Sequence, residues 1–139
     1  MSKLASLLQQ QKCLIPYFTF GDPSVKFTES LCEEAIHAGA DILEIGLPFS
    51  DPIADGPIIQ ASHQRALQHK SEVTVQRALE MVSRLSTKYD TPIIFMGATN
   101  LILQYGVHEF FKEAKKHGLA GIILPDLVVE GANDYIKAS

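Results

Sequence analysis

Hydrophobic and polar positions along the chain follow two alternating periods. Short apolar runs, typical of buried strands, occupy residues 13–20, 42–47, 93–96 and 121–126. Between them, apolar residues recur three and four positions apart, as in amphipathic helices, in residues 25–38, 58–67, 72–90 and 107–117. Strands that alternate with helical connections predict βαβ units and a parallel sheet.

The same pattern predicts how the elements begin, end and face the core. Residues 1–11 form a leading helix, and residues 12–139 carry four strands and their helices, so residues 1–139 are expected to form a single domain. Ser24 is placed to cap the first connecting helix, and residues 101–105 are expected in a loop. The apolar face of that first helix is expected to comprise Phe27, Leu31, Ala35 and Ile36.

Two α/β architectures fit this alternation. Strands begin 28 residues apart, counting from 13 to 41 and from 92 to 120, as in a (β/α) barrel, although a flavodoxin-like open sheet has the same regularity. Acidic residues fall at or just after the strand ends: Asp22, Glu44, Asp55 and Asp126. In both folds the active site lies at the carboxyl ends of the strands. The pattern therefore predicts an active site there and does not distinguish the two folds.

Composition narrows the classes of partner. The 139 residues are 46% hydrophobic and 20% charged, as in a soluble globular protein. A net charge of −4 provides no basic surface for nucleic acid or anionic membranes. No apolar run is long enough to cross a membrane, so we expect a cytoplasmic protein. Cys13 and Cys32 do not indicate a disulfide framework and are expected to be buried thiols.

Glu44 is an unusual residue for an apolar strand. With strand alternation, Glu44 shares one face with Ile42 and Gly46, while Leu43 and Ile45 share the other. A carboxyl group buried there has a raised pKa, which suits it to carry a proton near neutral pH. The alternative is a structural Glu44 paired with a buried cation or a backbone amide.

The loop after this strand carries Asp51 and Asp55. Three prolines keep the loop from forming a long helix: Pro48, Pro52 and Pro57. Asp55 precedes Gly56, so its alternative role is to fix a turn or to cap the following helix. A magnesium site from Asp51 and Asp55 lacks a third converging ligand, and no metal site is predicted.

Two stretches resemble a known family. Residues 43–57, which read Leu-Glu-Ile-Gly-Leu-Pro-Phe-Ser-Asp-Pro-Ile-Ala-Asp-Gly-Pro, and residues 16–23, which read Pro-Tyr-Phe-Thr-Phe-Gly-Asp-Pro, are similar to the tryptophan synthase alpha subunit. Weaker similarity extends to about residue 130. The resemblance implies a TIM-barrel type (β/α)8 fold. Because the family's chains are about twice as long, it implies about the first four β/α units here, a half barrel whose first and fourth strands are unpaired edges.

The resemblance also implies a reaction, the retro-aldol cleavage of indole-3-glycerol phosphate to indole and glyceraldehyde 3-phosphate. Glu44 would exchange the proton needed at indole C3 and at the neighbouring hydroxyl group. Asp55 would accept the hydrogen bond of the indole N–H. Tyr17 and Ile59 match positions that line the family's indole pocket.

A partner follows from the same resemblance. The loop residues Phe49, Ser50, Asp51 and Pro52 would contact a beta subunit that carries pyridoxal phosphate, while this chain needs no cofactor. The chain departs from the family at Ala98, where an aromatic residue usually stands, and at residues 127–131, which replace in part the usual proline and acidic pair after Asp126. The family's phosphate-binding loops follow its last strands. The alternative function is therefore a catalytically degenerate or truncated alpha subunit that only binds or modulates the beta subunit.

Overall fold

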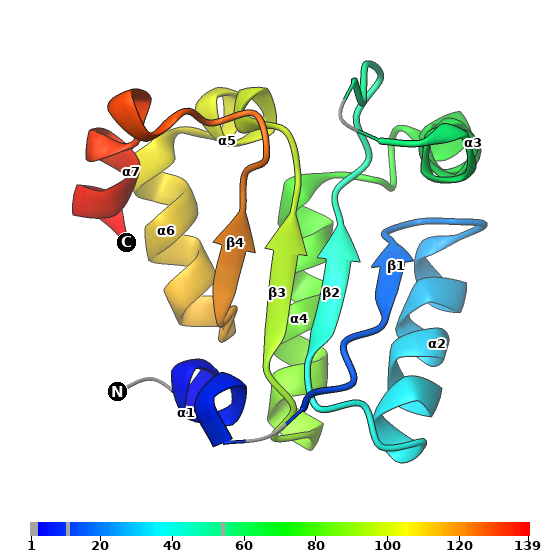
Figure 1. Ribbon diagram of the computed structural model, residues 1–139. Helices are drawn as coiled ribbons and strands as arrows, with labels where there is room; N and C mark the ends of the chain where they lie inside the picture. The colour runs from blue at the N-terminus through cyan, green and yellow to red at the C-terminus, as the bar shows by residue number, and fades with distance from the viewer. Residues whose placement is uncertain (1–2, 11, 54) are drawn as a thin grey trace.

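The computed structural model describes residues 3–10, 12–53 and 55–139 and contains a four-stranded parallel sheet (Figure 1). The strands are β1 (Tyr17–Thr19), β2 (Leu43–Gly46), β3 (Ile93–Met96) and β4 (Gly121–Ile123). The α-helices are α1 (Lys3–Gln10), α2 (Val25–His37), α3 (Pro57–Ala66), α4 (Val75–Lys88), α5 (Thr99–Tyr105), α6 (Val107–His117) and α7 (Asn133–Ala138). Two 3-10 turns complete the set, η1 (Leu67–His69) and η2 (Val129–Gly131).

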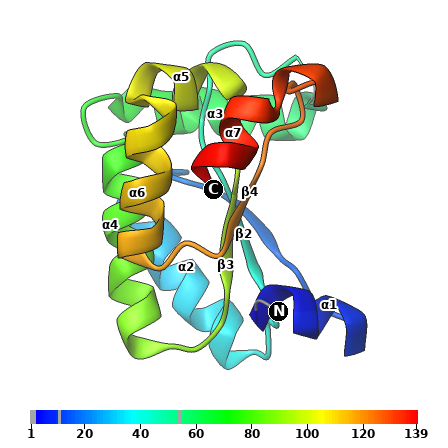
Figure 2. The same ribbon diagram turned by 90° about the vertical axis from the view of Figure 1, so that its left-hand side faces the viewer.

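The order of the strands distinguishes the two expected architectures. The strands lie side by side in the order β1-β2-β3-β4, all parallel, and the crossover helices α2, α4 and α6 lie on the same face of the sheet (Figure 2). A flavodoxin-like sheet reverses its strand order at a switch point and has helices on both faces. The observed arrangement is that of a half barrel, with β1 and β4 as its edges.

The hydrophobic core lies between the sheet and these helices. Leu43, Ile45, Ile93 and Phe95 point to the helix side and are almost completely buried. Five buried side chains of α4 pack in the same core: Ala78, Leu79, Met81, Val82 and Leu85. Burial of each large apolar side chain stabilises a fold by roughly 1.5–3 kcal/mol, so these contacts stabilise the packing of the helices on the sheet.

The opposite face of the sheet presents two rows of side chains. The strand register aligns Tyr17, Glu44, Ile94 and Gly121 in one row. The next row towards the carboxyl ends contains Thr19, Gly46, Met96 and Ile123. Several of these side chains are half-buried or exposed, in contrast to the helix side. This face corresponds to the interior of a complete barrel.

Helix α2 confirms one expectation and corrects another. Ser24 caps the helix as predicted, since its side chain accepts a hydrogen bond from the Phe27 N–H at 3.1 Å. Phe27, however, is 52% exposed, and Thr28 and Cys32 are the buried residues of the helix. The helix can bury Thr28 because the hydroxyl accepts a hydrogen bond from Gly21 N–H and lies 3.0 Å from the Ser24 carbonyl. Hydrophobicity alone could not reveal this pairing.

The expectation of a loop at residues 101–105 was wrong, because this segment belongs to helix α5. The helix begins at Thr99, whose N–H and hydroxyl both donate to the Asp126 carboxylate, at 2.9 and 2.7 Å. Asp126 lies beyond β4, which ends at Ile123 rather than continuing to residue 126 as predicted. The chain leaves the sheet early, and the cap of α5 therefore comes from a distant segment.

The ends of the chain and the two cysteines complete the fold. Helix α1 lies below the amino ends of the strands (Figure 1). Cys32 is buried as predicted, while Cys13 is only partly buried and lies before β1 rather than within it. Among the described residues, no helix is long and apolar enough to cross a membrane.

We predict that Asp126→Ala destabilises the protein by about 1 kcal/mol, because α5 loses the acceptor at its amino end. Urea unfolding followed by circular dichroism measures the change. Asp126→Asn, which retains one acceptor oxygen, should lose less. Glu34→Ala, an exposed residue of α2, is the matched control; equal effects of Asp126→Ala and Glu34→Ala would contradict the capping role.

Candidate active site

Glu44 lies in the middle of β2, on the face of the sheet away from the helices. Burial raises the pKa of its carboxyl group above the ordinary value. Among the described residues, no side chain or backbone amide pairs with this carboxyl group. The structural alternative, a Glu44 neutralised by a cation or an amide, is therefore not observed in this part of the chain.

Tyr17 of β1 packs across the strand beside Glu44. Its phenol lies where a side chain on Gly46 would be, so only glycine fits at that position of β2. Burial raises the pKa of Tyr17; the Thr19 hydroxyl opposes the shift, while the negative charges of Asp55 and Glu44 add to it. The phenol thus lies within the electrostatic influence of both carboxylates that the sequence singled out.

Asp55 approaches the site from the loop that follows β2. Its side chain is 17% exposed, and its carboxylate oxygen lies 3.9 Å from His63 Nε2. The turn that contains Asp55 is closed by a backbone hydrogen bond, in which Asp55 N–H donates to the Pro52 carbonyl at 3.1 Å. Helix α3 begins after Gly56 with no side-chain cap, so the Asp55 carboxylate does not cap it. The side chain is available for another role.

His63 is a site residue that the sequence analysis did not identify. It lies on α3, is 4% exposed, and brings its ring between Asp55, Tyr17 and the backbone of Phe49. A signal was available in the sequence, because His63 follows Ile59 by four positions and therefore lies on the same side of the helix. A lone histidine at such a position is hard to distinguish from an ordinary core residue.

A cavity of about 230 Å³ opens beside Asp55 at the carboxyl ends of the strands. Its walls include Asp55, His63, Met96, Ala98 and Asp126. The small Ala98 side chain therefore forms part of the wall at the position where the family usually has an aromatic ring. Asp126 also reaches this wall, but its carboxylate is occupied by Thr99 at the start of α5.

Tyr17 and Ile59, predicted to line the indole pocket together, share a different hollow of about 220 Å³ on the β1 side. Asp22 lines the same hollow and accepts hydrogen bonds from Ser62 and from the Arg65 guanidinium. Arg65 and Ser62 hold the pKa of Asp22 below its usual range although burial opposes them. Asp22 therefore joins the loop after β1 to α3. The structure places Tyr17 between this hollow and the cavity at Asp55, linked to the latter by His63.

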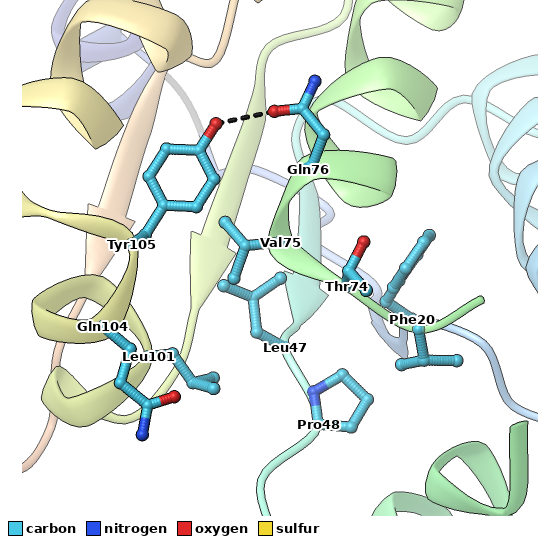
Figure 3. Close-up of a pocket in the computed structure, with 10 residues that line it drawn as sticks. Phe20, Leu47, Pro48, Thr74, Val75, Gln76, Leu101, Gln104 and Tyr105 are labelled. Carbon is cyan, nitrogen blue, oxygen red and sulfur yellow. Dashed lines mark hydrogen bonds between the residues drawn. The ribbon is translucent and has the colours of Figure 1, made fainter. Parts of the chain in front are cut away.

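A third hollow, of about 300 Å³, lies on the helix side of the sheet between α4 and α5 (Figure 3). Its lining is mostly apolar, with Leu47, Pro48 and Leu101 among the contributors. Of the described residues that line it, only Tyr105 is ionisable, and its hydroxyl donates to Gln76 at 2.6 Å. Neither Glu44 nor Asp55 is among the residues that line this hollow.

The predicted partner-binding residues Phe49, Ser50, Asp51 and Pro52 lie on the loop that rises above the strand ends (Figure 1). Ser50 and Asp51 are exposed, and the adjacent Ile53 is 90% exposed. Phe49 instead turns its N–H towards His63, at 3.3 Å. Among the described residues, no group of three or more metal-ligating side chains is placed to hold an ion, and Asp51 and Asp55 gain no third ligand there.

We predict that Gly46→Ala destabilises the protein by about 1–3 kcal/mol, because the new methyl group overlaps the Tyr17 phenol. A double-mutant cycle with Tyr17→Ala, measured by urea unfolding, should remove most of this cost. Gly131→Ala, whose methyl group would meet only ordinary contacts, is the control. If Gly46→Ala costs the same with and without the Tyr17 ring, the packing described here is wrong.

We predict that Glu44→Gln stabilises the protein at neutral pH. Because the folded-state pKa of Glu44 is raised, the native state binds its proton more tightly than the unfolded state. Stability is therefore highest below the unfolded-state pKa and falls as pH rises through the folded-state value. Glu44→Gln cannot ionise, so its advantage in unfolding free energy should shrink as the pH is lowered from about 8 to about 4.

The exposed Glu34→Gln serves as the control in the same pH series, measured by urea unfolding. It should follow the parent protein at every pH. An advantage of Glu44→Gln that does not change with pH would show that desolvation of the Glu44 carboxylate is not its origin.

Comparison with known proteins identifies the family. The model of the tryptophan synthase alpha chain family matches residues 4–139. The tryptophan synthase alpha chain of Petrotoga mobilis is 40% identical over 135 residues, which are 97% of this chain and 52% of that protein. The chain thus spans about half the length of the curated relatives it matches.

Solved structures of the same family resemble this chain in fold. The tryptophan synthase alpha subunit from Legionella pneumophila strain Paris superimposes with a TM-score of 0.87 at 41% identity, covering 97% of this chain and 52% of that one. A chain from the tryptophan synthase α2β2 complex of Pyrococcus furiosus gives a TM-score of 0.82 at 40% identity, covering 91% and 50%. Sequence and architecture therefore lead to the same conclusion: this chain belongs to the tryptophan synthase alpha chain family and comprises about half of its barrel.

Proposed function

We propose that this chain supplies the acid–base half of the active site that cleaves indole-3-glycerol phosphate to indole and glyceraldehyde 3-phosphate. The observation that carries the proposal is Glu44, a desolvated carboxyl group with no partner among the described residues, on the sheet face that becomes a barrel's interior. A carboxyl group with a raised pKa can both donate and accept a proton near neutral pH.

Each carboxylate has a distinct task in this reaction. Glu44 protonates indole C3 and takes the proton from the hydroxyl group beside the bond that breaks. Asp55, in the more polar setting of the loop, accepts the hydrogen bond of the ring N–H and stabilises the positive charge that develops there. Tyr17 and Ile59 would contact the substrate's ring from the β1 side, and the cavity beside Asp55 offers space on the other.

The proposed partner is a beta subunit. The relative from Pyrococcus furiosus belongs to an α2β2 complex described as mutually activating. In this chain, Phe49, Ser50, Asp51 and Pro52 would contact that partner from the loop above the strand ends. The pyridoxal phosphate would reside on the beta subunit and not here, and both chains would work in the cytoplasm.

A second candidate function is binding without catalysis. It is favoured by Ala98, a small side chain in the wall of the cavity beside Asp55 where the family usually has an aromatic residue, and by the exposed Ile53 of the loop. The loop would then contact the beta subunit and alter its activity, while Glu44 and Asp55 would take no part in catalysis.

We predict that the purified chain releases indole from indole-3-glycerol phosphate, and that Glu44→Gln and Asp55→Asn each lower kcat by roughly 10²- to 10⁴-fold. Indole release is followed by absorbance or fluorescence with and without a beta subunit. Glu34→Gln, an exposed carboxylate of α2, is the control and should keep full activity.

Two outcomes would contradict the proposal. Release that survives Glu44→Gln would remove Glu44 from the mechanism. No release by a cooperatively folded chain, with or without the beta subunit, would rule out the lyase reaction for this chain. Stimulation of the beta subunit by such an inactive chain would establish the second candidate function instead.

A further inference from the structure

His63 is a buried polar residue to which the proposed mechanism gives no role. Its ring has three polar neighbours among the described residues: Phe49 N–H at 3.3 Å from Nδ1, the Tyr17 hydroxyl at 3.4 Å from Nε2, and the Asp55 carboxylate at 3.9 Å from Nε2. The ring thus contacts the predicted partner loop with one nitrogen and the predicted site with the other.

The neighbours determine the tautomer of the ring. A backbone N–H can only donate, so Nδ1 must present its lone pair to Phe49. The proton of the neutral ring is then on Nε2, where it faces two oxygens that can accept it. A proton on Nδ1 would instead place two donors against each other in a buried site, at the cost of an unsatisfied group.

The arrangement also restrains Asp55. Its segment is otherwise held by backbone bonds, from Asp55 N–H to the Pro52 carbonyl and from the Gln60 side chain to the Asp55 carbonyl. Neither bond fixes the carboxylate. His63, on α3, places Nε2 at 3.9 Å from the Asp55 carboxylate and at 3.4 Å from the Tyr17 hydroxyl, so this nitrogen is the one that faces the carboxylate.

We propose that His63 is a positioning residue that orients Asp55 through Nε2–H, with its own ring oriented by the Phe49 N–H. This inference rests on the proposed function, because the role of Asp55 belongs to it.

Two substitutions at His63 test the roles of the two ring nitrogens one at a time. In His63→Asn, the amide oxygen replaces Nδ1 as the acceptor for Phe49, but nothing replaces Nε2–H. In His63→Gln, the longer side chain can place an amide N–H near Asp55, while the acceptor for Phe49 is lost. We expect His63→Asn to lower kcat for indole release by roughly 10- to 100-fold with little change in KM, and His63→Gln to keep most of the rate.

A purely structural role would not produce this split. If His63 only fills space, the two variants should lose stability and activity together, and kcat would not follow the donor at Nε2. Thermal unfolding of both variants accompanies the kinetics. Equal kcat values for the two folded variants, or a kcat of His63→Asn equal to that of the parent, would overturn the proposal.

A spectroscopic readout tests the proposal independently of activity. Long-range ¹H–¹⁵N correlation of histidine-labelled protein should show a protonated Nε2 and an unprotonated Nδ1 for His63. Asp55→Asn should shift the Nε2 resonance of His63 and leave the exposed His69 unchanged. A proton on Nδ1, or an Nε2 resonance of His63 that Asp55→Asn does not shift, would refute the inference.

These two measurements separate the inference from the function. If the chain releases no indole but His63 carries its proton on Nε2 and responds to Asp55→Asn, the lyase proposal fails and the positioning contact stands. If the chain releases indole and His63→Asn has the same kcat as the parent protein, the lyase proposal stands and the positioning role of His63 fails.

Discussion

The core of this protein forms on one face of its sheet, where the side chains of β2 and β3 pack against α2, α4 and α6. Leu43, Ile45, Ile93 and Phe95 are buried there almost completely. Because strand side chains alternate, burial of one set directs Glu44 and its row to the other face. The protein can therefore keep an ionisable residue in the middle of a strand without placing it in the hydrophobic core.

The carboxylates near the strand ends are divided between structure and chemistry by their partners. Asp22 is bound by Ser62 and Arg65, and Asp126 accepts two hydrogen bonds at the start of α5. Both hold loops in place. Within residues 3–10, 12–53 and 55–139, Glu44 and Asp55 lack such partners, apart from the distant approach of His63 to Asp55. The paired carboxylates stabilise the frame, and Glu44 and Asp55 are the candidates for contact with a substrate.

The site connects segments that are far apart in the sequence through a few close contacts. Tyr17 lies over Gly46 and next to His63, and His63 in turn contacts the backbone of Phe49. A change at any of these positions alters the surroundings of Glu44 and Asp55 and leaves the two carboxylates themselves in place.

Much of the architecture was predictable from local patterns. Alternating apolar runs and helical spacing predicted the parallel α/β arrangement, the bounds of β3 and α6, and the Ser24 cap, since these depend on residues close in sequence. Glu44 was identified for the same reason, because a carboxylate inside an apolar strand is visible in the sequence alone.

Other features were decided by contacts between distant segments. Helix α5 was predicted as a loop because its cap, Asp126, lies 27 residues away from Thr99. Phe27 was placed in the core because a hydrophobicity pattern cannot show that Thr28 satisfies its hydroxyl group there. His63 gains its significance only when α3 folds against β1 and the Asp55 loop. The sequence determined the local elements and their chemistry, while tertiary structure decided which polar groups found partners, since that depends on distances that only folding sets.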